Sequence, residues 1–292
     1  MSQLQKFIMT SALPYGNGAL HLGHMVEHIM TDVWVRSQRL QGHEGLMICG
    51  DDAHGTPIML KAQQMGITPE ELTLNIQRGH EQDLADFSVQ YDIYHTTHSQ
   101  ENQALVHEIY QRILNAGDIL QQTISQAYDS QAKMFLPDRY IKGTCPRCKA
   151  LDQYGDNCEK CGATYNTNEL IDALSTVTLT PPEYRDTVHF FFNLPRYAEF
   201  LENWAKTGHV PVEMAHKLDE WFASGLKPWD ISRDAPYFGF LIPGETDKYF
   251  YVWLDAPIGY MAATEKYCQQ HHLDFSQFWG PLSEYALYHN VG

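Results

Sequence analysis

The sequence of 292 residues has no apolar run close to the roughly 18 residues that a membrane-spanning helix requires. Its start, Met1 to Lys6, lacks the charged and then apolar segments of a secretory leader. Internal repeats and low-complexity tracts are absent as well. We therefore expect a soluble, cytoplasmic protein, and its 43% of hydrophobic residues suffices for one large or two medium cores.

Basic residues are scarce. Lys and Arg number 20 against 36 Asp and Glu, so the net charge is 20 − 36 = −16. Because proteins bind phosphate backbones through Lys and Arg, this charge argues against a general affinity for nucleic acids. An RNA-dependent activity would rely on local contacts or on a surface outside these residues, and the charge does not separate the two.

Cysteines are also few, six in all, but four of them form two Cys-x2-Cys pairs with nine residues between the pairs. The four are Cys145, Cys148, Cys158 and Cys161. Two such pairs complete a tetrahedral, all-thiolate zinc site. Two redox pairs are the alternative, but they would not need each other nearby. With four protein ligands there is no open position, so the predicted zinc is structural.

The first part of the chain alternates between strand and helix patterns. In order, we predict a strand over 7–13, a helix from Leu22 that Gly42 closes, a strand over 44–49, a helix from Thr68 and a helix over 99–117. Pro69 and Glu71 supply the first helical position and a capping box after Thr68. This alternation predicts an α/β fold with a parallel sheet.

From about residue 118 the pattern changes, with a strand-like segment over 119–128 ahead of the cysteine pairs. A helix is predicted over 213–225 and a buried, aromatic strand over 249–254. We therefore expect an inserted module of different architecture. The predicted domains are 1–116 for the first half of the main domain, 117–231 for the insertion with its zinc knuckle at 145–161, and 232–292 for the return to the main domain.

The segment from Pro14 to His24 carries the clearest chemical signal. A strand leads through a glycine-containing turn into a helix start, where N–H groups and partial positive charge favour phosphate. His21 and His24 lie three residues apart and could both donate to a triphosphate. Gly23 between them would let a planar base approach the backbone. The spacing alone also fits a metal pair or polar residues on a solvated helix face.

His21-Leu22-Gly23-His24 is similar to the HIGH signature of class I aminoacyl-tRNA synthetases and related nucleotidyltransferases. The wider stretch 12–24, with 50–58 and 249–260, resembles the methionyl-tRNA synthetases in particular, and the resemblance covers essentially the whole chain. It implies a Rossmann-like catalytic domain interrupted by a zinc-knuckle connective insertion. It also implies activation of L-methionine by ATP with Mg²⁺, followed by transfer to tRNA(Met).

The resemblance assigns roles to matching positions. Catalysis falls to His21, His24, Asp52 and Arg233, and ATP binding to Tyr15, Asn17, Gly23 and His24. The methionine site would contain Ala12, Leu13, Tyr15, Asp52, Trp253, Ala256, Pro257 and Tyr260. An aromatic, apolar pocket suits a thioether, and an acid should hold the ammonium group. From the residues alone, Trp253 and Tyr260 would more often be ordinary core residues, and Arg233 could equally be the partner of a plain ion pair.

The family's lysine-rich KMSKS loop does not occur in this sequence, which ends at Gly292. We therefore expect the N-terminal part of a catalytic unit, truncated before that loop and with uncertain activity alone. Two alternatives remain at this point. One is a class I synthetase for another apolar amino acid, and the other is a non-catalytic RNA- or partner-binding fragment built on the zinc knuckle.

Overall fold

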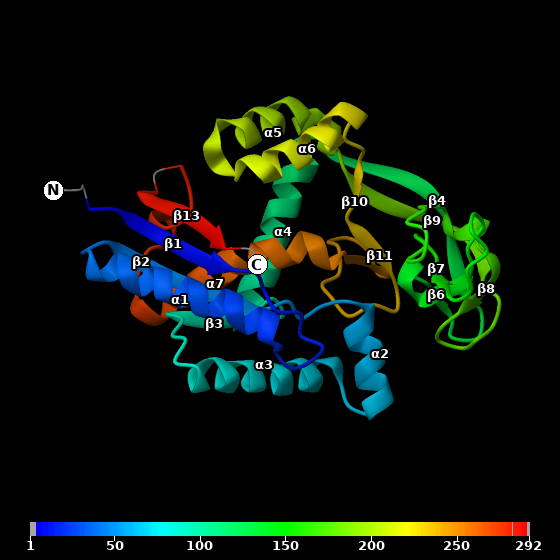
Figure 1. Ribbon diagram of the computed structural model, residues 1–292, viewed down its shortest axis with the longest axis horizontal. Coiled ribbons are helices and arrows are strands. Elements are labelled where there is room, and N and C mark those ends of the chain that lie inside the picture. The colour runs from blue at the N-terminus through cyan, green and yellow to red at the C-terminus, as the bar shows by residue number, and fades with distance from the viewer. Residues whose placement is uncertain (1–3, 282, 291–292) are drawn as a thin grey trace. The chain divides into compact units, whose positions relative to one another are not determined.

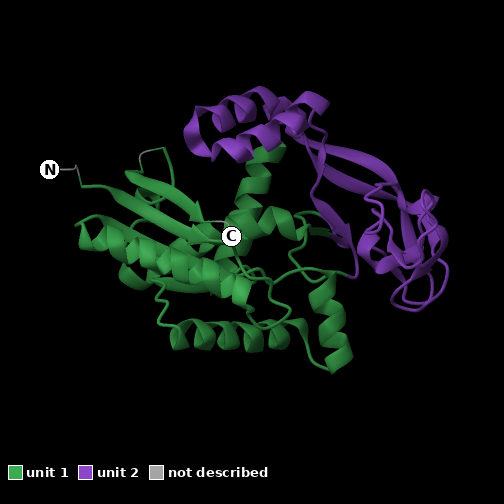
Figure 2. Ribbon diagram, viewed as in Figure 1, with its two compact units in different colours: residues 1–115, 237–244, 249–292 green, residues 116–236, 245–248 purple. Residues whose placement is uncertain are grey.

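The computed structural model describes residues 4–281 and 283–290. The chain forms two compact units, shown in Figure 2. The first comprises Met1–Asn115, Tyr237–Gly244 and Tyr249–Gly292, and the second Ala116–Pro236 and Glu245–Lys248. The insertion predicted from the sequence ends at residue 231. The second compact unit continues to Pro236 and also includes the short segment Glu245–Lys248.

The first unit is built on a parallel sheet with the strand order β13-β1-β2-β3 (Figure 1). Its strands are β1 (Lys6–Ser11), β2 (Glu44–Asp51), β3 (Ile93–Thr96) and β13 (Tyr285–Asn290). The central strands β1 and β2 are buried along most of their length, as expected of strands covered on both faces. The predicted α/β fold with a parallel sheet is confirmed.

Helices cover both faces of this sheet. Helices α1 (Leu22–Leu40) and α3 (Pro69–Asp86) lie on one face and α7 (Val252–His271) on the other, while α2 (Thr56–Met65) packs against α3 and α4 (Gln100–Asn115) against α7. Because side chains alternate along a strand, Phe7 and Met9 pack with residues of α1 and α3, whereas Ile8 packs with Ala263 and Cys268 of α7. The result is a core on each side of the sheet.

The predicted helix start at Thr68 is confirmed in detail. The Thr68 side chain accepts a hydrogen bond from Glu71 N at 3.1 Å, and the Glu71 side chain accepts one from Thr68 N at 3.2 Å. Pro69 occupies the first turn, where its missing N–H costs nothing. The helices predicted from Leu22 and over 99–117 correspond to α1 and α4.

The prediction of a strand over 249–254 is wrong for the second half of that range. Strand β12 covers only Lys248–Phe250, and helix α7 begins at Val252. Aromatic and branched residues favoured a strand locally, but Asp255, Ile258 and Ala262 recur at helical spacing and are buried. Packing of that helical face against the sheet outweighs the local preference.

The second unit is largely antiparallel and has two sheets. One has the order β10-β9-β4-β5 and the other β7-β6-β8, and β11 pairs with β12 in a separate two-stranded sheet. The strands of the second unit are β4 (Ile119–Asp129), β5 (Met134–Phe135), β6 (Ile141–Thr144), β7 (Gln153–Tyr154), β8 (Ile171–Ser175), β9 (Glu183–Phe192), β10 (Trp229–Asp230) and β11 (Ser232–Asp234). The strand segment predicted over 119–128 corresponds to β4.

The helices of the second unit include α6 (Val212–Ser224), which matches the helix predicted over 213–225, and α5 (Ala198–Trp204). Short helical turns are η1 (Asp138–Tyr140), η2 (Thr167–Glu169), η3 (Leu194–Tyr197), η4 (Ala205–His209) and, in the first unit, η5 (Phe275–Gln277). Within residues 4–281 and 283–290, no helix is long and apolar enough to span a membrane.

Candidate functional site

The site predicted from the sequence lies where the order of the strands reverses. From β1 the chain moves to β2 and β3 on one side, whereas β13 lies on the other side of β1. In doubly wound sheets ligands bind beyond the carboxyl ends of the strands at this reversal. The loop that follows β1 there is the histidine-containing segment 12–21.

The loops after β1 and β2 are joined by backbone hydrogen bonds. Gly16 N donates to Asp52 O at 2.7 Å, and Asp52 N donates to Pro14 O at 2.9 Å. Tyr15 and Asp52 form the parallel bridge between the two loops. The two predicted segments, far apart in sequence, are therefore neighbours at the carboxyl end of the sheet.

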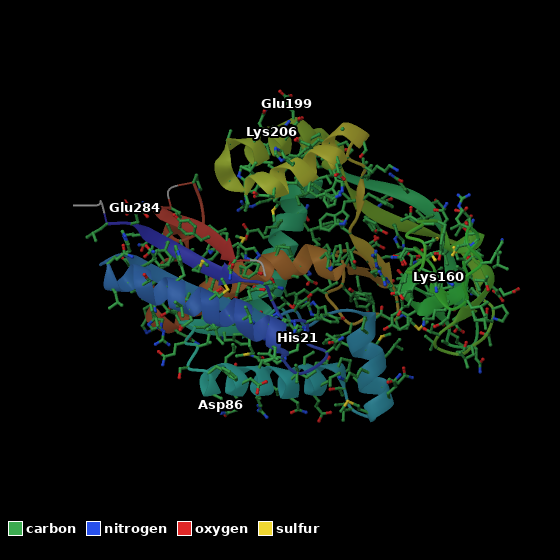
Figure 3. All side chains as sticks on the ribbon, viewed as in Figure 1. His21, Asp86, Lys160, Glu199, Lys206 and Glu284 are labelled. Atoms are coloured by element: carbon green, nitrogen blue, oxygen red, sulfur yellow. The ribbon has the colours of Figure 1, made fainter. Side chains whose placement is uncertain are left out.

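His21 and His24 cap helix α1 together, and Figure 3 marks His21 at its start. His24 N donates to His21 Nδ1, and His21 N donates to His24 Nδ1, both at 3.3 Å. The two rings stack with their centroids 3.6 Å apart. Because each Nδ1 accepts a hydrogen bond, each neutral ring carries its proton on Nε2. Both histidines thus present an N–H donor at a helix N-terminus, which suits an anion.

Gly23 makes this arrangement of the rings possible. A Cβ at this position would lie 2.9 Å from His21 Cε1 and 3.1 Å from His21 Nδ1. The close approach of a base to the backbone at Gly23 stays a prediction. Burial, with His21 and His80 nearby, lowers the pKa of His24, although Glu27 opposes the shift. The neutral form that the cap requires is therefore favoured.

The residues predicted from the 249–260 segment share one face of α7. Trp253, Ala256, Pro257 and Tyr260 are spaced at i, i+3, i+4 and i+7, which is the repeat of a helix face. Trp253 and Pro257 are exposed, and Ala256 and Tyr260 are half-buried. A strand would have divided these residues between two faces, so the helix unites the predicted set.

Tyr260 connects this face of α7 to the end of β1. Its hydroxyl donates to the Ser11 carbonyl oxygen at 3.0 Å. A Cβ added at Gly259 would lie 3.5 Å from Leu13 Cδ1, so the helix also packs closely on the predicted apolar residue. Trp253 is 62% exposed, and its ring lies 5.6 Å from that of Tyr251.

Ala12 and Asn17 belong to the same loop but are held by other elements. Ala12 N donates to Glu27 Oε1 at 2.6 Å, and the Asn17 carbonyl oxygen accepts a hydrogen bond from Lys61 Nζ. Their predicted contacts with methionine and ATP stay predictions.

The buried carboxyl group of Asp52 is the main electrostatic feature of the site. Its Oδ1 is buried and has no hydrogen-bond partner among the described residues. Burial, and then the nearby Asp255 carboxylate, raises the pKa of Asp52 well above its usual range, although the backbone N–H of His54 opposes the shift. A buried carboxyl group with an unpaired oxygen is complementary to a cation that can donate hydrogen bonds, such as an ammonium group.

Buried histidines surround the site, and sequence reasoning missed them. His54 bonds to Asp255 Oδ2 through Nδ1 and to His98 Nδ1 through Nε2, each at 2.9 Å. His28 Nδ1 lies 2.5 Å from the Tyr91 hydroxyl. The only sequence signal was the position of His54, two residues after Asp52.

Because His54 and His28 are buried, we expect the protein to lose stability in mild acid. Burial lowers the pKa of His54 to about 3, and burial, then His24 and His80, lowers that of His28 to about 4. The unfolded chain therefore takes up protons below about pH 6.5 that the folded chain does not. The free energy of unfolding should fall by about 1.4 kcal/mol per pH unit for each histidine.

Urea unfolding between about pH 6 and pH 5 measures this slope. In each of the single variants His28→Asn and His54→Asn, the slope of the free energy of unfolding against pH should be smaller than in the wild type by the contribution of about one proton. Slopes equal to that of the wild type in both variants would show that these histidines are not held neutral.

Arg233 lies on β11 in the second unit. Its Nη1 donates to the Ser232 carbonyl oxygen at 2.6 Å and lies 3.3 Å from Asp230 Oδ2. The ion pair weighed in the sequence analysis therefore exists. A role at reacting phosphates stays a prediction.

The four cysteines of the predicted metal site converge. Their sulfur atoms all lie within 4.8 Å of one another. Cys145 Sγ is 3.9 Å from Cys161 Sγ, and Cys148 Sγ is 3.6 Å from Cys158 Sγ. Four sulfurs at about 2.3 Å from one ion in a tetrahedron are about 3.8 Å apart, so the cluster fits zinc.

Backbone N–H groups favour the thiolate form of Cys145 in this cluster. Arg147 N and Cys148 N each donate to Cys145 Sγ at 3.4 Å, and Cys161 N donates to Cys158 Sγ at 3.4 Å. Burial raises the pKa of Cys145, but these hydrogen bonds outweigh it and lower the pKa to about 6. The four cysteines could therefore hold a metal ion.

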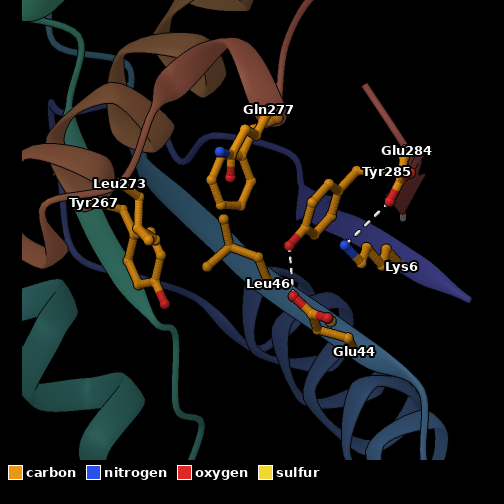
Figure 4. A pocket seen from close by; sticks show the side chains of 10 residues that line it. Lys6, Glu44, Leu46, Tyr267, Leu273, Gln277, Glu284 and Tyr285 are labelled. Atoms are coloured by element: carbon orange, nitrogen blue, oxygen red, sulfur yellow. Dashed lines mark hydrogen bonds and ion pairs between the residues drawn. The ribbon is translucent and has the colours of Figure 1, made fainter. Parts of the chain in front are cut away.

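A cavity of about 490 Å³ lies at the opposite, amino end of the sheet (Figure 4). Its lining includes Lys6, Glu44 and Tyr285, at the starts of β1, β2 and β13. Lys6 pairs with Glu284 at 3.2 Å, and the Tyr285 hydroxyl donates to Glu44 at 2.6 Å. These polar groups satisfy one another, and no predicted site residue lines the cavity.

Comparisons with known proteins indicate the same family as the sequence motifs. The family model described as "tRNA synthetases class I (M)" matches residues 7–292. Two solved structures of Mycobacterium tuberculosis methionyl-tRNA synthetase with methionyl-adenylate are similar to this chain, and each is 22% identical to it in sequence. The first has a TM-score of 0.71, and the match covers 94% of this chain and 50% of the chain in that structure. The second has a TM-score of 0.73, and the match covers 99% of this chain and 51% of the other. The chain spans about half the length of these structures, which establish the fold.

Proposed function

The chain belongs to the class I tRNA synthetases, in the group designated M, and from this premise we propose that it carries the amino-acid activation site of a methionine–tRNA ligase. L-methionine and ATP would give methionyl-adenylate and pyrophosphate, and the methionyl group would pass to tRNA(Met). The observation that carries the proposal is the unpaired, buried oxygen of Asp52, whose backbone pairs with the loop that leads into the His21–His24 helix start.

In the proposed reaction Asp52 binds the ammonium group of methionine. Leu13, Tyr15 and Tyr260 contact the thioether side chain, which packs well against aromatic edges. A methionine carboxylate oxygen forms a bond to the α-phosphorus of ATP, and the bond from that phosphorus to the bridging oxygen breaks, which releases pyrophosphate. The contribution of the protein is positioning and charge stabilisation.

His21 and His24 would stabilise the charge that develops on the phosphates. Their Nε2–H groups are directed from the start of α1, where the helix dipole adds partial positive charge. Mg²⁺ bound with ATP would neutralise part of the triphosphate charge. Arg233 is proposed as a further cation for the phosphates.

The cysteine cluster is proposed to bind one structural Zn²⁺ ion that shapes the second unit, where tRNA contacts are also proposed. The proposed location is the cytoplasm. Its reducing conditions fit the six cysteines, none of which forms a disulfide.

Formation of the adenylate in a single turnover tests the activity. Zinc-loaded chain is mixed with MgATP and L-methionine, and methionyl-adenylate is quantified after acid quench, with leucine, isoleucine and valine as matched substrates. We expect adenylate with methionine alone. Adenylate with another amino acid would identify a different class I specificity. RNA or protein binding without any response to methionine or ATP would favour a non-catalytic role and contradict the proposal.

A further inference from the structure

His80 is a buried residue that belongs to none of the motifs, yet it bridges two loops of the site. It lies on α3 with 1% of its surface exposed. Its Nδ1 is 2.8 Å from Asp51 Oδ1 at the end of β2, and its Nε2 is 2.7 Å from the Gly18 carbonyl oxygen. The imidazole therefore links the end of β2 to the loop that leads into His21.

The partners of the ring define its protons. A carbonyl oxygen only accepts, so Nε2 must carry a hydrogen for Gly18. Asp51 Oδ1 also accepts from the Tyr94 hydroxyl at 2.5 Å, which fits a carboxylate that receives a second donor from Nδ1. Burial lowers the pKa of His80, but the hydrogen bonds to Asp51 and Gly18, with Asp83 nearby, raise it overall.

We propose that His80 is a positioning residue of the nucleotide site, holding the Gly18 carbonyl toward α3 and thereby orienting the loop before His21. The neighbouring Asn17 carbonyl is held in a similar way by Lys61 Nζ of α2. In a trans peptide the N–H points opposite to the C=O. The N–H groups of Gly18 and Ala19 therefore face away from these cations.

The loop thus directs two successive backbone N–H groups away from the side chains that hold its carbonyls, and successive backbone N–H groups are the donors that bind phosphate in backbone nests. His80 acts through Gly18 and does not itself touch the nucleotide. The inference rests on the proposed function, because it concerns the ATP part of the same site. It predicts that loss of the Gly18 contact weakens ATP binding and leaves methionine binding intact.

Two substitutions separate the two hydrogen bonds of the ring. The amide nitrogen of Asn replaces Nδ1 and reaches Asp51 only, whereas that of Gln replaces Nε2 and reaches Gly18. Calorimetry then gives the affinities of wild type, His80→Asn and His80→Gln for MgATP and for L-methionine. We expect His80→Asn to bind MgATP about tenfold more weakly or worse, with His80→Gln close to wild type.

Tyr94→Phe is the matched control, because it removes a hydrogen bond to Asp51 without touching Gly18. Its MgATP affinity should equal that of the wild type. If wild type binds MgATP and His80→Asn binds it equally well, the inference alone is wrong. A parallel loss of methionine affinity, or unfolding of both His80 variants, would make His80 a residue of general structure and overturn it. No MgATP binding by folded wild type would overturn the proposed function together with the inference.

Discussion

Replacing Asp52 by Asn is expected to weaken L-methionine binding at least about thirtyfold without lowering thermal stability. Truncating one partner of a buried, hydrogen-bonded charge pair costs roughly 2–5 kcal/mol, and 1.4 kcal/mol is a factor of ten in affinity. The Asp52 carboxyl is buried near Asp255, and both effects raise its pKa. A neutral amide avoids this burial of charge, so the folded state should tolerate the change.

Calorimetric titration with L-methionine and a thermal melt measure the two quantities on the same samples. Asp86→Asn is the matched control, because it removes an exposed carboxylate of α3. It should bind methionine as the wild type does. Methionine affinity that survives in Asp52→Asn would show that another group binds the ammonium. A large fall in melting temperature would instead make Asp52 a residue of the fold.

Replacing Cys148 by Ser is expected to remove most of the bound zinc and to destabilise the second unit. The four sulfurs lie within 4.8 Å of one another, and the binding free energy of structural zinc is about 10–16 kcal/mol in zinc-finger peptides. Because the metal binds the folded form, its loss is a loss of folding free energy. Metal analysis by mass spectrometry and a thermal melt report the two effects.

Lys160→Ser is the control for this change, because Lys160 is exposed in the loop between Cys158 and Cys161 and supplies no thiolate. It should retain full metal and the melting behaviour of the wild type. Full metal occupancy with unchanged melting in Cys148→Ser would contradict the assignment. Formation of two disulfides under mild oxidants, in a metal-free sample of equal stability, would favour redox pairs.

The elements predicted from the sequence were those whose signals are local. The capping box at Thr68 and the apolar run of β1 each lie within a few residues, and both were identified. Strand β3 was missed because Ile93–Thr96 is too short to show an alternating pattern. Helix α2 was not predicted, although Pro57 lies in its first turn, where proline is common.

The parts of the site that could not be predicted depend on distant partners. His80 meets Asp51 and Gly18, which are 29 and 62 residues away in the sequence. His54 meets Asp255, 201 residues later. No local spacing encodes such contacts, because the parallel sheet brings the carboxyl ends of its strands together only after folding.

The most direct test of the account is calorimetric titration of the zinc-loaded chain with L-methionine, with leucine, isoleucine and valine as controls. The account predicts saturable binding of methionine and none, or far weaker binding, of the other three. That result would place the methionine site within these residues, at the loops after β1 and β2 and the exposed face of α7. Absence of methionine binding in a folded sample, or equal binding of leucine, would contradict it.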